Sequence, residues 1–276
     1  MLLAIDIGNT NIVFGIFAGR KLAVSLRLAT WPDRTADELW VVVSQLLAGR
    51  RVAIDAIDGV VLSSVVPALT KTVAEMVERG LGRRLLRVDT SNAGLAVRYD
   101  NPDEVGADRL VNGVAACELY GTESRPVIVV DFGTATTFDA VSMRQGYLGG
   151  VICPGVDISA DALFQRAARL PRVEVSRPAG LIGRTTVASM QSGLFFGHVA
   201  MVQGIVERLR EALRDEGDAV CVATGGLAAA IAAETPIIDH VDQDLTLTGL
   251  RLVWERNQSR RPDAPGEAEA AGGHSR

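Results

Sequence analysis

A short acidic turn occurs twice in this chain, each time between two apolar runs. The stretch AIDIGNT holds the first copy and VVDFGTA the second, so Asp6 and Asp131 lie 125 residues apart in the same local context. Because Gly and Asn tolerate the backbone angles of tight turns, either stretch alone would be interpreted as a plain β-hairpin. The repetition indicates instead that one folding unit is present twice.

Hydrophobic periodicity predicts the order of elements in the first copy. A meander of three antiparallel strands is expected at residues 2–6, 12–17 and 22–28. The stretch TADELWVVVSQLLAG then predicts a helix that begins with a Thr35-x-x-Glu38 capping box and has Gly49 past its end. A buried strand in DGVVLSSVVP, a helix with Pro67 at its first position and a strand in RLLRVD complete the order βββαβαβ.

The second copy follows the same order. Residues 125–155 predict three more strands, a helix is expected near 157–169, and a long helical run extends from about 186 to 214. The buried strand DAVCVATGG ends at Gly225 and Gly226, and the alanine-rich helix LAAAIAAE follows it. The fold class is therefore α/β, with the βββαβαβ unit duplicated.

The repeat also sets the expected domains. We expect one domain at residues 1–118 and a second at residues 119–256. Residues 257–276 lack periodic apolar residues and are rich in Pro, Gly, Ala and charge, which predicts a disordered tail. A chain of 276 residues that is 48% hydrophobic has enough apolar material for two packed domains of about 130 residues.

Composition argues against several classes of partner and location. A formal net charge of -5 argues against nucleic acid and against an anionic membrane surface, since both need clustered Lys and Arg. The apolar stretches are interrupted well before ~18 residues, so neither a membrane span nor a signal peptide is expected. The three cysteines are scattered through apolar stretches, which is typical of a reducing, cytoplasmic setting. The three histidines are isolated and fit no zinc site.

Two hairpins that face each other across a cleft would suit a polyphosphate. Backbone N–H groups at the glycines and the hydroxyl of Thr134 would meet the phosphates, while Asp6 and Asp131 would hold the accompanying cations. No GxxxxGK[ST] sequence occurs, which excludes a P-loop. The VATGG stretch adds a third element, because paired glycines let an adenine or ribose approach the backbone. Glycine at such a connection is also common for packing alone.

Further stretches narrow the interpretation to one family. DIGNTN, DFGTATTFD and ATGG resemble the phosphate and adenosine motifs of the acetate and sugar kinase, heat-shock ATPase and actin superfamily. SSVVP, YDNPDEVGADRL, VVDFGTATTFD, LGGVICPG and GRTTVASMQSG together resemble type III pantothenate kinases, over residues 2 to about 252. The resemblance implies two ribonuclease-H-like βββαβαβ domains that flank a nucleotide-binding cleft. It also implies a homodimer that phosphorylates pantothenate with ATP and Mg²⁺ and needs a monovalent cation, K⁺ or NH₄⁺.

The same resemblance implies roles for individual residues. The ATP phosphates would be lined by the first hairpin, namely Asp6, Ile7, Gly8, Asn9, Thr10, Asn11, Ile12 and Val13. Thr134 would contact ATP from the second hairpin, and Asp131 would bind the monovalent cation. Pantothenate would be held by Tyr99, Gly106, Ala107, Asp108, Arg109 and Thr186, with Asp108 as the proton acceptor.

Several of these residues also have a purely structural interpretation. Asp108 lies in the first turn of the expected helix GADRLVNGVAACEL, where it could merely complement the helix dipole by ~0.3–1 kcal/mol. The same position lets Asp108 present a carboxylate to a hydroxyl while Arg109 presents a guanidinium to an anion, and pantothenate carries both groups. Tyr99 stands in a turn and could be plain surface. Thr185 or Thr186 could be a helix cap.

Three classes of function are compatible with the superfamily. A metabolic kinase is favoured, in which positioning and electrostatics supply most of the rate. The alternative is a non-catalytic nucleotide-binding regulator, which would be expected to lack Asp108 or Asp131, whereas both are present. A chaperone or filament ATPase needs large additional domains, for which 276 residues leave no room. Gly193, Gly197 and Gly204 in the long helix indicate a close helix contact, within the chain or across a dimer.

Overall fold

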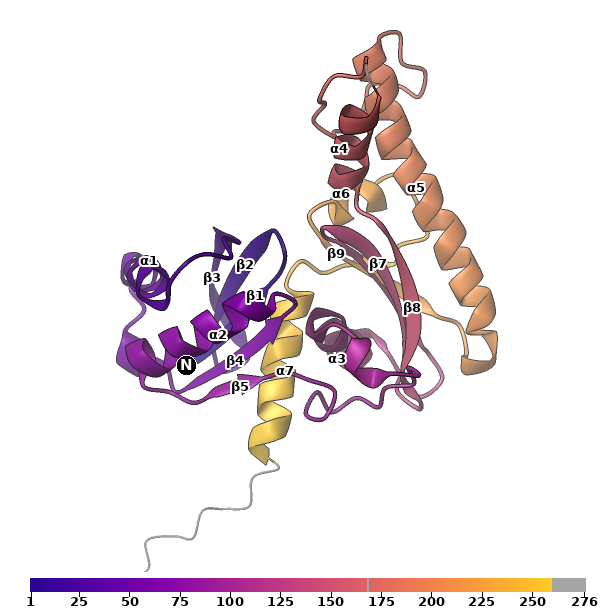
Figure 1. The fold of residues 1–276 in the computed structure, drawn as a ribbon. Helices are drawn as coiled ribbons and strands as arrows, with labels where there is room; N and C mark the ends of the chain where they lie inside the picture. Colours follow the sequence, from indigo (N-terminus) through magenta and orange to yellow (C-terminus); the bar gives the residue numbers. More distant parts are fainter. Residues whose placement is uncertain (168, 260–276) are drawn as a thin grey trace, which may run out of the picture.

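The computed structural model describes residues 1–167 and 169–259, which form two lobes, each built on a five-stranded sheet (Figure 1). The first lobe contains β1 (Leu2–Ile7), β2 (Asn11–Ala18), β3 (Lys21–Ala29), α1 (Ala36–Gly49), β4 (Gly59–Ser64), α2 (Pro67–Met76) and β5 (Leu85–Arg87). After α3 (Ala107–Tyr120), the second lobe contains β6 (Val127–Phe132), β7 (Ala135–Ser142), β8 (Gly146–Pro154), α4 (Val156–Arg166), α5 (Thr186–Ala212), β9 (Val220–Gly225), α6 (Ala228–Ala232) and β10 (His240–Val241). The last helix is α7 (Leu245–Ser259). Short helical turns lie at Ile54–Ala56, Val77–Leu81, Pro102–Glu104 and Arg214–Glu216.

The two sheets have the same topology. Their strand orders are β3-β2-β1-β4-β5 and β10-β9-β6-β7-β8, so β1 corresponds to β6. In each sheet the first three strands are antiparallel neighbours, and the next two pair in parallel beyond the first. The register is also equivalent, since Asp6 lies opposite Ser63 and Asp131 lies opposite Thr224. The predicted duplication of a βββαβαβ unit is confirmed.

Amphipathic helices cover the sheets and close the cores. The capping box expected at the start of α1 is present, with the Thr35 amide donating to a Glu38 carboxylate oxygen at 2.9 Å. Helix α1 then buries Leu39 and Val43 against the first sheet, in a cluster shared with α2. Because these side chains recur at helical spacing, one face of the helix supplies the whole contact.

Helices α3 and α7 lie side by side between the two sheets (Figure 1). Val114 of α3 and Leu250 of α7 share one core cluster with Val61 of the first sheet. On its other side, α3 packs Ala115 and Ala116 against strands of the second sheet. The start of α3 is therefore held at the junction of the lobes. The division into residues 1–118 and 119–256 stays a prediction.

Several boundaries differ from expectation, and helix α4, expected near 157–169, ends at Arg166. Helix α7 was not expected from the sequence, and it continues to Ser259, so the expected start of the tail at residue 257 is wrong by three residues. The side-chain amide of Asn257 donates to the Asn92 carbonyl oxygen at 2.8 Å, which ties this last turn to the first lobe. The rest of the expected tail, 260–276, lies outside the described residues. Gly49 lies inside α1 rather than past its end, and Arg50 is the C-cap.

Helix α4, residues 169–185 and the first half of α5 project beyond the second sheet as an arm (Figure 1). Exposed apolar side chains gather on this arm, namely Ile158, Leu163, Phe164, Leu181, Ile182 and Val187. Gly193 and Gly197 of α5 have open space where a side chain would stand, so they make no close contact with another helix in the described part of the chain. Among the described residues, no helix is both long enough and apolar enough to cross a membrane.

Candidate active site

The two repeated hairpins meet at the junction of the lobes. Gly8 donates its amide hydrogen to the Asn11 carbonyl oxygen at 2.9 Å and so closes the turn between β1 and β2. The hydroxyls of Thr10 and Thr134 are 2.8 Å apart, so the tips of the two hairpins touch. Both threonines are exposed, which leaves the hairpin tips accessible to a ligand.

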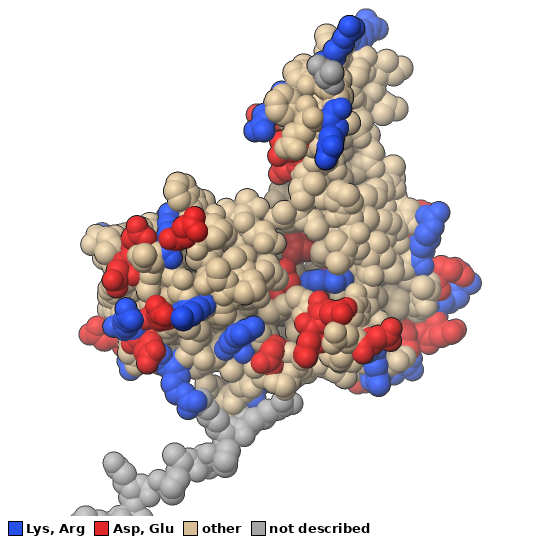
Figure 2. All heavy atoms as spheres, in the orientation of Figure 1, with Lys and Arg blue, Asp and Glu red and all other residues tan. Residues whose placement is uncertain are grey.

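The two repeated acids lie at the carboxyl ends of corresponding strands. The Ser63 hydroxyl donates to Asp6 Oδ1 at 2.6 Å, and the Asn112 side-chain amide donates to Asp131 Oδ2 at 3.0 Å. Burial raises the pKa of each carboxyl from 3.8 to about 7, and the nearby charge of Asp108 adds to both shifts. Figure 2 shows acidic side chains on the floor of the hollow between the lobes.

Asp108 and Arg109 are held by the first turn of α3. Gly106 is the N-cap residue, and Asp108 Oδ1 accepts a hydrogen bond from the Arg109 amide at 2.8 Å. Burial raises the pKa of the Asp108 carboxyl, while this hydrogen bond and the Arg109 charge oppose the rise. A buried carboxylate with a raised pKa is a suitable proton acceptor.

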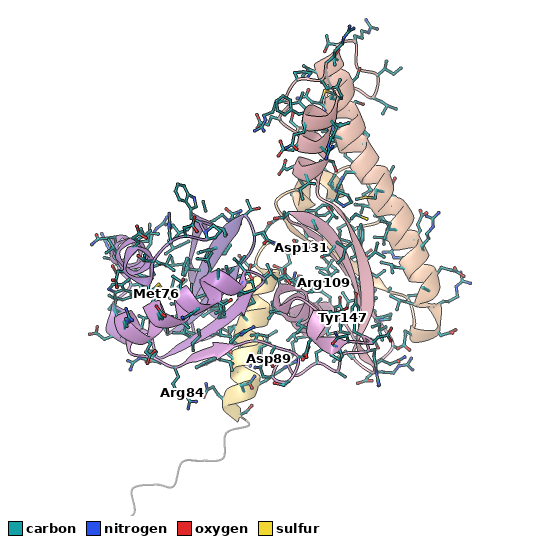
Figure 3. All side chains as sticks on the ribbon, viewed as in Figure 1. Met76, Arg84, Asp89, Arg109, Asp131 and Tyr147 are labelled. Carbon is teal, nitrogen blue, oxygen red and sulfur yellow. The ribbon has the colours of Figure 1, made fainter. Side chains whose placement is uncertain are left out.

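Arg109 is fixed from the side of the second sheet. Its Nε donates to Asp139 Oδ1 at 2.7 Å, and Nη2 lies 2.6 Å from the same oxygen. The Tyr147 hydroxyl donates to that oxygen too, at 2.6 Å. The Tyr99 ring lies 6.1 Å from the Tyr147 ring, so Tyr99 belongs to the same group. Figure 3 shows Asp131, Arg109 and Tyr147 where the second sheet meets α3.

The paired glycines after β9 lie beside the second hairpin. Gly225 has a positive φ of 89°, and a Cβ there would lie 2.8 Å from Asp131 Oδ1. Gly226 is exposed, and a Cβ there would meet no atom within 4 Å. Gly225 is therefore required by the backbone and by Asp131, whereas Gly226 leaves an open surface for a flat ligand.

One predicted site residue lies apart from the others. Thr186 is the first residue of α5, exposed at the far end of the arm (Figure 1). The helix cap is Thr185, whose hydroxyl accepts from the Ala188 amide at 3.1 Å. The structure thus brings together the two hairpins, Tyr99 and the start of α3, but not Thr186.

The donor set fits hard cations held jointly with phosphate. Asp6 and Asp131 offer carboxylate oxygens, which Mg²⁺ prefers. Among the described residues, no group of three or more His, Cys, Asp or Glu is arranged to hold a metal by itself. Mg²⁺ in phosphoryl-transfer sites usually takes one or two carboxylates and completes its shell with phosphate oxygens and water. Asp6 and Asp131 meet that requirement.

Sequence reasoning missed several side chains that support the site. Asn112 donates to Asp131, and its own oxygen accepts from the Thr246 hydroxyl at 2.8 Å. The spacing of Asn112 four residues after Asp108 places both on one face of α3 and is a signal that could have found it. Asp139 stands inside the quoted stretch DFGTATTFD, but nothing in the local sequence pairs it with Arg109. Only the fold brings Asp139 of β7 next to Arg109 of α3.

Together with the sheet topology, the two repeated hairpins define the class of fold. The chain has the fold of the sugar kinases and actin-like ATPases. A Sinorhizobium meliloti protein described as a 2-dehydro-3-deoxygalactonokinase has the same fold, with a TM-score of 0.56, 11% identity, and 98% of this chain and 100% of that chain covered. A Campylobacter jejuni protein described as a Baf family transcriptional activator gives a TM-score of 0.57 at 20% identity, over 93% of this chain and 99% of that chain.

Comparison of the sequence with known proteins identifies one family within this class. The family model for type III pantothenate kinase matches residues 2–208. The type III pantothenate kinase of Moorella thermoacetica is 53% identical over 258 residues, which are 93% of this chain and 100% of the relative. The chain belongs to the type III pantothenate kinase family.

Proposed function

We propose that the protein transfers the γ-phosphoryl group of ATP to the primary hydroxyl of pantothenate. The product, 4′-phosphopantothenate, is the first intermediate of coenzyme A biosynthesis. The observation that carries the proposal is the pairing of Asp108 with Arg109 at the start of α3, between two touching hairpins, in a member of this family. One helix end thereby offers a base for a hydroxyl and a cation for a carboxylate.

Asp108 is the proposed general base. As the hydroxyl proton passes to the Asp108 carboxylate, the hydroxyl oxygen bonds to the γ-phosphorus. The bond from that phosphorus to the β–γ bridging oxygen breaks, and ADP leaves. Arg109 would pair with the carboxylate of pantothenate and hold the hydroxyl near Asp108. Thr10, Thr134 and the hairpin turns would line the phosphates.

Asp6 and Asp131 are the proposed cation ligands. Mg²⁺ would accompany ATP, and a monovalent cation, K⁺ or NH₄⁺, would lie at Asp131. When bound, these cations neutralise the charge of the triphosphate. The chain offers no P-loop lysine for that purpose.

A homodimer is the proposed assembly, and it would also account for Thr186. The arm carries exposed apolar side chains and two glycines, Gly193 and Gly197, at which a Cβ would meet no described atom within 4 Å. Thr186 is the first residue of α5 and so lies on the same arm, whereas Asp108 lies in the first turn of α3 at the junction of the lobes. If the arm of a second copy lies against the cleft, its first α5 turn brings Thr186 to the substrate. The supporting observations are the apolar arm and the family.

One assay tests the proposed function. Purified protein is incubated with ATP, Mg²⁺, pantothenate and either K⁺, NH₄⁺ or Na⁺, and 4′-phosphopantothenate is followed by mass spectrometry. We expect product in K⁺ or NH₄⁺ and a much lower rate in Na⁺ alone. Equal rates in the three salts would contradict the monovalent cation site. No product in any salt, together with measurable ATP binding, would favour the non-catalytic regulator.

A further inference from the structure

The side of Arg109 that faces away from α3 is enclosed by two residues of the second sheet. We call Asp139 and Tyr147 the arginine clamp. Asp139 has no exposed surface, and its Oδ1 receives Arg109 Nε at 2.7 Å and the Tyr147 hydroxyl at 2.6 Å. The Arg109 guanidinium also lies over the Tyr147 ring, 5.7 Å from its centre. One edge of the guanidinium is therefore fixed by charge, and one face by the ring.

The backbone of β8 closes the clamp. A Cβ at Gly150 would lie 2.8 Å from Arg109 Nη2 and 3.1 Å from Asp139 Oδ1, so the chain passes directly over the ion pair. Only a residue without a side chain permits this approach. The guanidinium is thereby confined between strand, ring and carboxylate.

Arg109 Nη2 is held by the same carboxylate. It is buried and lies 2.6 Å from Asp139 Oδ1, the oxygen that also accepts from Nε. An ion pair through two neighbouring nitrogens fixes the plane of the guanidinium as well as its position.

Without the clamp, Arg109 would have closer partners than a substrate. The charge of Asp108 raises the pKa of Asp131 and of Asp139, and the charge of Arg109 lowers the pKa of Asp108. A guanidinium that turned onto Asp108 would neutralise the proposed base and withdraw the cation from the substrate. A buried ion pair is weak evidence for stability, so a role in orientation explains Asp139 better.

Tyr147 also organises the opposite wall of the substrate site. Its amide donates to the Ala96 carbonyl oxygen at 2.7 Å, and its carbonyl oxygen accepts from the Arg98 amide at 2.8 Å. These two bonds tie the segment that carries Tyr99 to β8. One residue thus sets both the Arg109 side chain and the approach to Tyr99.

We propose that Asp139 and Tyr147 are positioning residues that hold Arg109 for the carboxylate of the substrate and away from Asp108, an inference that rests on the proposed function. Neither residue touches the reacting atoms. Their effect is on recognition of the acid group. The clamp makes the site selective for a carboxylate over an uncharged amide of the same shape.

Asp139→Asn and Tyr147→Phe test the clamp by steady-state kinetics. Asp139→Asn keeps the side-chain shape and removes the charge. It should raise the KM for pantothenate about tenfold or more, with the KM for ATP within about threefold of wild type. The preference for pantothenate over its primary amide should fall by a similar factor. Tyr147→Phe keeps the ring and should raise the KM for pantothenate only about threefold.

The double variant and a matched control separate positioning from general damage. Because both residues act through Arg109, the double variant should be within about twofold of Asp139→Asn. Asp239→Asn removes another aspartate that pairs with an arginine, Arg210 at 2.7 Å, away from the cleft. This control should change neither KM. Thermal unfolding of each variant establishes that it is folded.

Three results would overturn the clamp. They are an unchanged KM for pantothenate in Asp139→Asn, equal losses for the acid and the amide, and full additivity in the double variant. If the wild-type protein phosphorylates no pantothenate, the proposed function fails by itself. Calorimetric titration of pantothenate onto wild type and Asp139→Asn then decides the clamp, because equal affinities, or no binding to wild type, refute it.

Discussion

Four aspartates share the junction between the lobes, and each is placed by a different element. Asp6 and Asp131 end corresponding strands, Asp108 starts α3, and Asp139 lies within β7. Only Asp139 has a full positive partner, Arg109. The other three act on one another through space and are expensive to ionise together. The negative charge of these aspartates is balanced only when the site also holds cations.

Asp108→Asn tests the proposed base. The substitution keeps an oxygen for the Arg109 amide, so the protein should fold normally. Loss of a general base usually lowers kcat by ~10²–10⁴, and a loose phosphoryl-transfer transition state favours the lower end of that range. The KM for ATP should change little. The measurement is kcat at saturating pantothenate.

Asp37→Asn is the matched control for that variant. Asp37 occupies the second position of α1, as Asp108 does in α3, but it is exposed on the first lobe, away from the start of α3 (Figure 1). Both changes remove a charge that complements a helix dipole, for ~0.3–1 kcal/mol. Only Asp108→Asn should lower kcat. A kcat within about threefold of wild type for Asp108→Asn would leave Asp108 with the helix-dipole role alone.

The raised pKa values of Asp6 and Asp131 predict a pH-dependent stability without ligands. Each carboxyl has a pKa of about 7 in the folded protein and 3.8 as its ordinary value. Between these pH values the folded state binds more protons than the unfolded state, so the free energy of unfolding falls as pH rises. In metal-free buffer with choline as the cation, Tm should decrease from pH 5 to pH 8.

Asp131→Asn supplies the control for this pH effect. It removes one buried charge, so it should flatten the decline and unfold at a higher Tm than wild type at pH 8. The gain should be about 1–2 kcal/mol, because the site is partly open to solvent. Activity should be lost in the same variant. A wild-type Tm that rises over this pH range would contradict the raised pKa values.

At the scale of elements, local patterns predicted most of the fold. The duplicated hairpins, the capping box of α1 and Pro67 at the start of α2 are short-range signals, and all were found where expected. Helix α7 was missed, since its polar and apolar residues do not separate into a clear stripe in LTLTGLRLVWERNQS. It is buried on several sides by α3 and the first sheet, which the sequence alone does not reveal.

The site residues show the same difference between short-range signals in the sequence and contacts that only the folded chain makes. The hairpin residues were predictable because each motif is contiguous in the sequence. The partners Ser63, Asn112 and Asp139 come from other strands and helices, and only the register of the sheets and the crossing of α3 bring them in. Thr186 is the reverse case, because its predicted role requires a contact that one chain does not make.

Gly225→Ala tests the connection between β9 and α6. The residue has φ of 89°, and a methyl group there would lie 2.6 Å from the Phe132 carbonyl oxygen and 2.8 Å from Asp131 Oδ1. We expect a loss of ~1–3 kcal/mol in the free energy of unfolding. Urea denaturation measures the change.

Gly226→Ala is the neighbouring control. An added methyl group would meet no atom of the protein, so the free energy of unfolding should stay within about 0.5 kcal/mol of wild type. If the open surface at Gly226 receives the adenosine, the KM for ATP should rise nonetheless. Equal destabilisation by the two substitutions would show that the backbone of Gly225 has no special requirement.

At the scale of the whole molecule, the junction and the arm point to different partners. The junction collects the hairpins and the start of α3 from one chain. The arm presents apolar side chains to solvent, with Ile182 exposed over 85% of its surface. Exposed patches of this kind usually mark an interaction surface. A second copy of the chain is the proposed partner, because Thr186 of one copy could then reach the junction between the lobes of the other.

Ile182→Glu tests whether the arm forms the homodimer and completes the substrate site. Placing a charge in an apolar interface disfavours association, so this variant should be a monomer by light scattering at micromolar concentration, whereas wild type should be a dimer. The KM for pantothenate should rise at least tenfold, because Thr186 of the second copy is lost. ATP binding should be nearly unchanged, since both hairpins belong to one chain.

Val41→Glu is the control for that experiment, because Val41 is 60% exposed on α1, away from the arm. It should leave the dimer and both KM values intact. Thr186→Val then separates assembly from contact, since it should raise the KM for pantothenate without dissociating the dimer. A wild-type monomer would refute the dimer. An Ile182→Glu monomer with normal pantothenate kinetics would instead show that each chain builds its substrate site alone, with Thr186 outside it.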